Sequence, residues 1–363
     1  MIIENLSLKN YRNYSSASVD LSSEFNVISG ANAQGKTNLL ESMVYLSLSK
    51  SHRTNDDSLL IKHGCEYAKI SCRFKSGVEK NISALIRSAG KTLMIENQPV
   101  LKSSAFIGQL NVVLFAPDDL RIFEDQPRER RRMMNQEISK ISNRYLISLN
   151  NYQGLLRQRN ILLKQKKIDM NYLDTLDEQM IKEEVKIIHS RRVFVEEINQ
   201  LLPDIYQKLS TENIKSKMVY HCCIDNSESA EELNSMLKSA REKDMETGTT
   251  TSGIHREDLS FTMDGRNLIE TASQGQRRMM MLAYKMALLQ FIQKISKDTP
   301  ILLLDDVLSE LDIEHQKRLI SMVHKPCQCI ITCTEIPAFL KEQNAAEYYI
   351  ENGTIAVQKR GTL

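Results

Sequence analysis

The spacing of apolar residues changes along the chain, and each kind of spacing predicts a different element. Alternation of apolar and polar residues, typical of half-buried strands, occurs at 2–21, 67–94 and 218–224. Largely apolar runs, typical of strands covered on both faces, occupy 25–28, 112–115, 301–304 and 329–332. Helical spacing follows at 38–48, 230–245 and from 273 to about 296. Strands and helices thus alternate in both outer parts of the chain, which predicts an α/β fold.

The middle of the chain has a different pattern, because apolar residues there recur at three- and four-residue steps. Those between 127 and 163 lie on one face of a single expected helix, and those from 173 to 202 form two stripes with a seven-residue repeat. Two long helices joined by the polar turn 164–171 predict an antiparallel hairpin with arms of about 50 Å each. Either Asp169 or Asn171 is expected to cap the second helix.

A glycine-rich segment stands between the first largely apolar run and the first helix. It has the pattern G-x-x-x-x-G-K-T and consists of Gly30, Ala31, Asn32, Ala33, Gln34, Gly35, Lys36 and Thr37. Between a strand and a helix, this pattern predicts a loop whose backbone N–H groups bind phosphate, helped by the positive end of the helix. Lys36 would place its charge at the β- and γ-phosphates, and the Thr37 hydroxyl would bind Mg²⁺. The alternative is an ordinary glycine turn.

A second motif ends the apolar run at 301–304 with Asp305 and Asp306. Ligands of open parallel sheets bind at the carboxyl ends of strands, so both acids are expected to face the phosphate loop. Asp305 would then hold Mg²⁺, and Asp306 would orient or deprotonate the attacking water.

A third motif opens the helix that runs to about residue 296, and consists of Ser273, Gln274, Gly275 and Gln276. Serine followed three residues later by glutamine is a capping box, which is the structural interpretation. The same geometry also offers a hydroxyl and free N–H groups to an anion. Because the chain also has a phosphate loop, we favour a second γ-phosphate site, with nucleotide held between two copies of the chain.

Composition and charge narrow the classes of function. The 363 residues carry a net charge of only +2, so any DNA surface must come from local clusters. The candidates are Arg131 and Arg132 at the base of the hairpin, and Lys164, Lys166 and Lys167 at its tip, where Arg157 and Arg159 are also expected. A solvated tip is the alternative. Arg53, after the first helix, either contacts a phosphate or is a solvated loop arginine.

Two absences bear on location and cofactors. No apolar run reaches the about 18 residues needed to cross a bilayer, and the N-terminus has no signal pattern, so a cytoplasmic protein is expected. None of the seven cysteines shows C-x-x-C spacing. Buried free thiols are therefore expected, and not a zinc site.

The motifs also resemble those of known families. Their order is that of an ATP-binding-cassette ATPase, and the helical hairpin between them is similar to the arm of SMC-like repair ATPases, although much shorter. Five segments resemble the bacterial RecF family across essentially the whole chain: LKNYRNY at 8–14, GKTNLLE at 35–41, FAPDDL at 115–120, GIHR at 253–256 and SQGQRR at 273–278.

The resemblance implies a fold and an assignment of sites. Residues 1–120 and 213–363 would form the two halves of an ABC-ATPase-like head, with mixed sheets and flanking helices, and 121–212 an inserted antiparallel helical hairpin lobe. Lys36 and Thr37 would bind ATP and Mg²⁺, Asp305 the metal, and Asp306 would serve hydrolysis. Ser273 would act in trans as the signature serine.

The resemblance also implies an activity: a weak, DNA-stimulated ATPase that forms a homodimer with ATP. Such proteins act in recombinational repair, replication and the SOS response, where they work with RecR- and RecO-type mediators to load recombinase at gaps between single- and double-stranded DNA. Some residues depart from the family pattern. Ala33 replaces a glycine, Ile254 a proline, and 131–135 the usual residues after the arginines, while Thr334 stands where transporter cassettes carry a switch histidine. Slow hydrolysis is therefore expected.

Three other classes of function compete with this hypothesis. The first is the energising subunit of a membrane transporter, against which the inserted hairpin argues. The second is a chromosome tether, for which the hairpin is short. The third is a phosphate-loop kinase, which would not dimerise with ATP.

Overall fold

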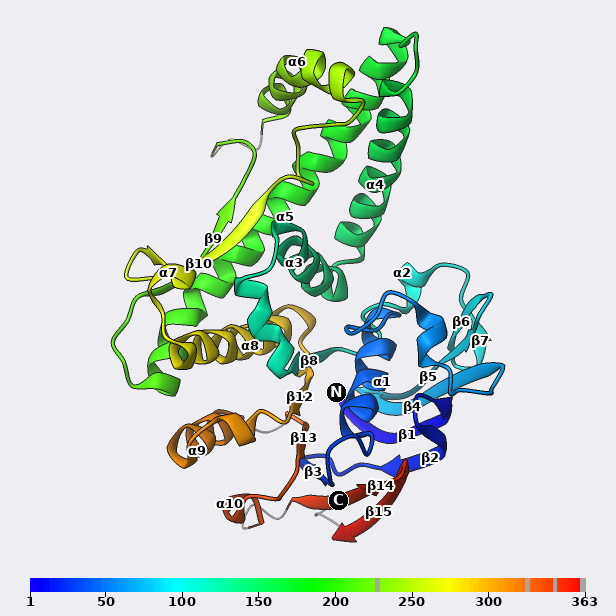
Figure 1. Ribbon diagram of the computed structural model, residues 1–363, viewed down its shortest axis with the longest axis vertical. Coiled ribbons are helices and arrows are strands. Elements are labelled where there is room, and N and C mark those ends of the chain that lie inside the picture. The colour runs from blue at the N-terminus through cyan, green and yellow to red at the C-terminus, as the bar shows by residue number, and fades with distance from the viewer. Residues whose placement is uncertain (226–228, 324–326, 342–344, 360–363) are drawn as a thin grey trace. The chain divides into compact units, whose positions relative to one another are not determined.

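The computed structural model describes residues 1–225, 229–323, 327–341 and 345–359 (Figure 1). Contacts divide the chain into two compact units, which are described separately. We call the first unit the head; it comprises Met1–Asp119, Ile205–Glu212 and Met279–Leu363. We call the second unit the lobe; it comprises Leu120–Asp204 and Asn213–Arg278.

This division differs from the boundaries expected from the sequence, which gave 213–363 to the head. Residues 213–278 group with the helices of the lobe because their strands pack on those helices, as the contacts of β10 (Asp258–Met263) with α3 (Pro127–Ile141) illustrate. Conversely, 205–212 group with the head. Short strands reveal their own alternation in the sequence but not the element against which they pack.

The described part of the head contains two six-stranded sheets. The first is antiparallel, in the order β2-β1-β4-β5-β6-β7. Its strands are β1 Ile2–Tyr11, β2 Tyr14–Asp20, β4 Tyr67–Ser76, β5 Val78–Arg87, β6 Gly90–Ile95 and β7 Gln98–Pro99. The strands expected at 2–21 and 67–94 are therefore confirmed.

The second sheet is mixed, in the order β15-β14-β3-β13-β12-β8. All neighbours are parallel except β14 and β15, which form a hairpin. Its strands are β3 Phe25–Ser29, β8 Val112–Phe115, β12 Ile301–Asp305, β13 Cys329–Cys333, β14 Ala346–Glu351 and β15 Thr354–Lys359. The largely apolar runs of the sequence form β3, β8, β12 and β13, which pair side by side, as expected for strands covered on both faces.

Helix α1 (Lys36–Leu48) contacts strands of both sheets, namely β4 and β5 of the first and β8 and β12 of the second. Almost every one of its residues is buried, and its side chains share one apolar cluster with both sheets. A helix that is buried on nearly all sides is what such a central position requires. The head also contains the short helices η1 Asp57–Leu60, α2 Ser103–Phe106, η3 Leu308–Glu310 and α10 Ala338–Lys341, and α9 Ile313–Met322; η2 Pro117–Phe123 begins in the head and ends in the lobe.

The lobe is built on α3, α4 (Asn143–Leu163) and α5 (Met170–Ser210), and α4 and α5 form the expected antiparallel hairpin (Figure 1). It adds α6 Ala230–Thr247, α7 Leu268–Thr271 and a three-stranded antiparallel sheet of β11 Arg266–Asn267, β10 and β9 Ser216–His221. Helix α8 (Gln274–Ser296) starts in the lobe and continues into the head. The strand expected at 218–224 was predicted too long, since β9 ends at His221.

The single helix expected from 127 to 163 is wrong, because the chain breaks at Ser142. Its extended backbone ends α3, and its hydroxyl caps α4 by accepting from the N–H of Tyr145. Apolar spacing continues across the break, so periodicity alone did not reveal it. The arms are also unequal, since 21 and 41 residues give about 32 and 62 Å instead of about 50 Å each. Asp169 caps α5 through the N–H of Tyr172.

Arg159 is not a cation of the hairpin tip, which corrects the expectation from the sequence. Its side chain is fully buried, and it donates to Asp177 of α5 at 2.6 Å and to Asp244 of α6 at 2.7 Å. A third bond, at 2.9 Å, goes to the Thr250 hydroxyl. Arg157 remains exposed, as expected. The network ties together elements that are far apart in the sequence, which is why a charge count near the tip misplaced Arg159.

Replacement of Arg159 by alanine is expected to lower the free energy of unfolding by about 3–5 kcal/mol, because it leaves the buried carboxylate of Asp244 without its cation, whereas Asp177 keeps Arg241 at 2.8 Å. The matched control is Arg157→Ala on the same helix, which should stay within about 0.5 kcal/mol of the parent protein. Urea denaturation of the three proteins measures the difference. Equal stabilities of the two variants would contradict the buried network.

Candidate nucleotide-binding site

The parallel sheet brings the predicted motifs to one edge. Strands β3, β13 and β12 are adjacent, and residues near their carboxyl ends are in register, with Ile28 opposite Thr332 and Thr332 opposite Asp305. The phosphate loop follows β3, and Asp306 follows β12. Carboxyl ends of parallel strands are where such sheets bind ligands, so the arrangement expected from the sequence is present.

The backbone of the loop explains its two glycines. Gly30 has a φ of 150° and Gly35 a φ of 117°. A Cβ at Gly30 would collide with the carbonyl oxygen of Ile350, and one at Gly35 would lie 2.6 Å from the Asn13 side chain. Ala33 also adopts a left-handed φ of 67°, which costs an alanine about 1–2 kcal/mol. The loop therefore keeps the glycine-like conformation at Ala33 despite the side chain.

Lys36 is folded back onto the loop. Its Nζ donates to the carbonyl oxygens of Gly30 at 2.7 Å and Ala31 at 3.0 Å, and the residue is only 6% exposed. These bonds hold a single ammonium group against the loop, where backbone N–H groups would also meet a phosphate. The geometry agrees with the predicted role of Lys36 as a point charge for phosphate oxygens.

Thr37 and Asp305 offer oxygen ligands at a spacing that suits Mg²⁺. The Thr37 hydroxyl donates to Oδ1 of Asp305 at 3.1 Å. Adjacent ligands of octahedral Mg²⁺ at 2.0–2.1 Å lie about 2.9 Å apart, so these two oxygens fit the ion with little movement. Asp305 is buried, and its Oδ1 also accepts from the Thr332 hydroxyl at 2.7 Å.

Thr332 is a positioning residue that the sequence reasoning missed. Its hydroxyl donates to Asp305, and it accepts from the backbone N–H of Asp306 at 3.0 Å. It thereby fixes both acids from β13, the strand beside β12. The available signal in the sequence was a threonine in an otherwise apolar run that is typical of a buried strand. The structure buries Thr332 completely, and a buried hydroxyl needs a hydrogen-bond partner.

Asp306 has one carboxylate oxygen free for another ligand. Its backbone has a φ of 51°, an uncommon conformation for a residue other than glycine. Its Oδ1 is buried and has no hydrogen-bond partner among the described residues. A buried acceptor without a partner fits the predicted role of orienting a water molecule.

The β1–β2 turn supports the loop from outside. The Asn13 amide donates to the Gln34 carbonyl oxygen at 2.8 Å, and the Tyr14 hydroxyl to that of Gly35 at 2.9 Å. Asn38, in the first turn of α1, donates to Oδ1 of Asn13 at 2.9 Å. The sequence predicted strands around the segment at 8–14 and a resemblance in its residues, and the structure explains it further as a support for the loop.

Arg53 lies against the same end of α1. It donates to the Asn38 side chain at 2.9 Å and lies 3.7 Å from Glu41, while its own side chain is 43% exposed. Burial alone would raise the pKa of Glu41, but hydrogen bonds from Arg12 and Ser51 outweigh burial and hold the pKa below its ordinary value. Arg53 is therefore tethered beside the loop, and its contact with a phosphate stays a prediction.

The lobe contains the third motif. The Ser273 hydroxyl accepts from the N–H of Gln276 at 3.2 Å, and the Ser273 N–H donates to the Gln276 side chain at 3.0 Å. This reciprocal pair confirms the capping box. Ser273, Gln274 and Gly275 are exposed at the start of α8. Their predicted role in trans concerns a second copy of the chain and stays a prediction.

Comparison with known proteins agrees with these motifs. The family model described as RecF/RecN/SMC N terminal domain matches residues 2–356. The DNA replication and repair protein RecF of Clostridium acetobutylicum is 38% identical, over 98% of this chain and 99% of its own. Its namesake from Lactobacillus acidophilus is 36% identical, over 99% of this chain and all of its own. The chain belongs to the RecF family.

Solved structures agree with the family assignment. One is described as the recombination mediator protein RecF-ATP in the RecFOR pathway, with a TM-score of 0.91, 26% identity, and coverage of 98% of this chain and 97% of the other. An SMC head bound to the C-terminal winged-helix domain of ScpA gives a TM-score of 0.58 at 18% identity, covering 99% and 98%, and shows the fold alone. The predicted fold, an α/β ABC-ATPase-like head split by an inserted helical hairpin lobe, is confirmed.

The transporter alternative has no support in these matches. In the described residues, the structure contains no helix that is long and apolar enough to span a bilayer.

The candidate DNA contacts of this RecF-family chain differ in how exposed their side chains are and in whether they already have a partner within the chain. Arg131 is half-buried and donates to the backbone carbonyl oxygen of Glu257 at 2.5 Å, and Arg132 pairs with Glu129 at 3.2 Å. Lys164, Lys166 and Lys167 are exposed between α4 and α5, and none of them has an ion-pair partner in the part of the chain that is described. The lysines are thus the better candidates for a ligand.

Proposed function

We propose that this protein is an ATP-driven, DNA-binding switch of recombinational repair and replication restart, active in the SOS response in the cytoplasm. The observation that carries the proposal is the meeting of Lys36, Thr37, Asp305 and Asp306 at one edge of the parallel sheet. Membership of a family of DNA replication and repair proteins supports the biological role.

The proposed ligand of the head is ATP with Mg²⁺. Thr37 and Asp305 would hold the ion, which supplies positive charge to the phosphate oxygens. Lys36 adds a second charge at the loop, and the free oxygen of Asp306 orients the water. Thr334 is exposed and has no imidazole with which to contact a γ-phosphate. These features support an ATPase with slow turnover, and we propose that DNA stimulates it and that it acts as a timer.

The proposed active form is a homodimer. The exposed N-terminus of α8, with the Ser273 hydroxyl and the neighbouring N–H groups, would bind the γ-phosphate of ATP held by the other copy. Nucleotide then joins the two copies, and hydrolysis releases them. The dimer would bind gaps between single- and double-stranded DNA and, with RecR- and RecO-type mediators, help to load recombinase.

Sizing by light scattering, with and without ATP, Mg²⁺ and gapped duplex DNA, tests the proposal. We expect dimers only with ATP, and tighter DNA binding by the dimer because two copies double each positive cluster. DNA affinity that is the same with and without ATP would overturn the switch.

Joint replacement of Lys164, Lys166 and Lys167 by alanine tests the hairpin tip as a DNA contact. If each lysine contacts a phosphate, the slope of log affinity against log salt should decrease by about 2.7 per chain, without regard to base sequence. The control is the joint replacement of Lys69, Lys75 and Lys102, which are exposed lysines of the head, and which changes net charge equally. Binding titrations at several salt concentrations measure the slope. An unchanged slope and affinity would mean that the tip is not a DNA contact.

A further inference from the structure

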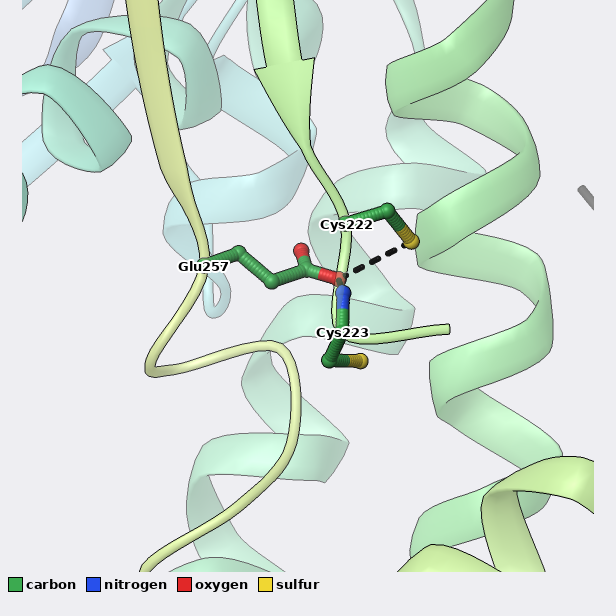
Figure 2. Close-up of side chains that lie close together, drawn as sticks. All are labelled: Cys222, Cys223 and Glu257. Carbon is green, nitrogen blue, oxygen red and sulfur yellow. Dashed lines mark hydrogen bonds between the residues drawn. The ribbon is translucent and has the colours of Figure 1, made fainter. Parts of the chain in front are cut away.

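Three potential metal ligands gather in the lobe beyond the end of β9. They are the thiols of Cys222 and Cys223 and the carboxylate of Glu257, and their ligand atoms all lie within 4.8 Å of one another (Figure 2). The Cys222 thiol lies 3.3 Å from Oε1 of Glu257, and the backbone N–H of Cys223 donates to the same oxygen at 3.1 Å. The nucleotide site described above uses none of these groups.

Strand pairing brings the three residues together. His221, the last residue of β9, pairs with Asp258, the first residue of β10, in antiparallel register. The next residue on each strand, Cys222 and Glu257, therefore face each other just outside the ladder. A search for C-x-x-C spacing misses this arrangement because the two cysteines are adjacent and the third ligand, Glu257, lies 34 residues after Cys223.

The carboxylate is already oriented for such a role. Its Oε2 accepts from the guanidinium of Arg191 and from the Tyr220 hydroxyl, and both Arg191 and Glu257 are almost completely buried. Oε1 is thereby left facing the thiols. Groups that hold the outer side of a ligand in this way are typical of metal sites, where they fix the ligand's orientation.

Charge also permits a divalent cation. Arg191 balances Glu257, and Arg192 adds a further positive charge 3.6 Å from the Cys222 sulfur. A divalent ion that binds two thiols releases two protons, because thiolates are the ligands. The net charge of the cluster then stays the same, and no oxidant or reductant is needed.

Solvent can reach the cluster. Both cysteines are half-buried, and Cys222 lines an open cavity of about 750 Å³ between α5 and β9, together with Arg192, Glu196, Tyr220 and Asp225. An ion has an entry path through this cavity, and a water molecule can occupy a fourth ligand position on that side.

We propose that Cys222, Cys223 and Glu257 form a binding site for a thiophilic divalent cation of the zinc class. Two thiolates and a carboxylate suit such an ion better than Mg²⁺, which prefers oxygen. Tetrahedral coordination with metal–sulfur bonds of about 2.3 Å places the sulfur atoms about 3.8 Å apart. In the present structure all three ligand atoms already lie within 4.8 Å of one another. The ion would link the segment after β9 to β10 and so stabilise the lobe.

Titration of the full chain with Co²⁺ and Zn²⁺ tests the site, with a non-thiol reductant and saturating Mg²⁺ present throughout. We expect one tightly bound Co²⁺ with the visible and charge-transfer absorption of tetrahedral thiolate coordination, and a higher Tm with Zn²⁺. Cys222→Ser and Cys223→Ser should each weaken binding by at least about 100-fold, the upper end of the loss seen for outer-shell partners. Cys65→Ser, a half-exposed thiol of the head, is the matched control and should bind like the parent protein.

Tyr220→Phe separates positioning from ligation. It should weaken Co²⁺ binding by about 10-fold and keep the thiolate spectrum, since only the orientation of Glu257 changes. Without metal, Cys223→Ser should melt at the temperature of the parent, which shows that any lost binding is not lost folding. A parent protein without the thiolate spectrum, or an equal loss in Cys65→Ser, would overturn the site.

Discussion

Replacement of Lys36 by arginine is expected to abolish most ATP hydrolysis while the fold persists. The Lys36 ammonium group is bonded to two loop carbonyl oxygens in a space that leaves the residue 6% exposed. A guanidinium is a planar fork and cannot replace a compact charge in this position. Loss of one preorganised donor typically costs about 100- to 1,000-fold in turnover.

Phosphate release at saturating ATP, together with thermal melting, measures this effect. The matched control is Lys50→Arg, the same change at an exposed lysine just after α1, for which we expect the turnover of the parent protein. Normal turnover by a well-folded Lys36→Arg protein would show that the loop is not the catalytic phosphate site.

Ser273→Arg is expected to prevent ATP-dependent dimerisation and hydrolysis, while each chain still binds ATP. The phosphate loop belongs to the head and is not altered by this change. Arginine at the exposed start of α8 places bulk where we propose that the partner's γ-phosphate binds, and removes the hydroxyl that caps the helix. Loss of the cap alone costs about 1 kcal/mol of stability.

The control must therefore lose a cap without touching the proposed interface. Ser229→Arg serves this purpose, because Ser229 caps α6 by accepting from the N–H of Glu232 in the same way. Sedimentation with ATP should show dimers for Ser229→Arg and monomers for Ser273→Arg. Dimers in both would mean that Ser273 acts only as a helix cap.

Local sequence determined the elements that carry the nucleotide site. The positive φ angles at Gly30 and Gly35 require glycine, so these glycines predict the phosphate loop. A strand that is buried on both faces requires apolar residues, so the apolar run before Asp305 predicts that strand. The rule that parallel strands present their carboxyl ends at one edge then placed Asp305 near Thr37, and the structure has this arrangement.

Tertiary structure decided where charged and polar side chains face. In the sequence, Arg159 stands among the cations near the hairpin tip. In the structure it is buried and donates to Asp177 and Asp244, which lie 18 and 85 residues away along the chain. Thr332 became a support for Asp305 only when β13 paired with β12.

The break at Ser142 and the cluster at Cys222 follow the same rule. Ser142 separates α3 from α4, although the apolar spacing continues from one helix to the next. Glu257 lies beside the cysteines only because β9 pairs with β10. Periodicity encodes which face of an element is buried, so the sequence by itself determined the elements and the nucleotide motifs. It does not encode the partner that covers that face, because such partners come from pairings between distant segments, and only the folded chain decided them.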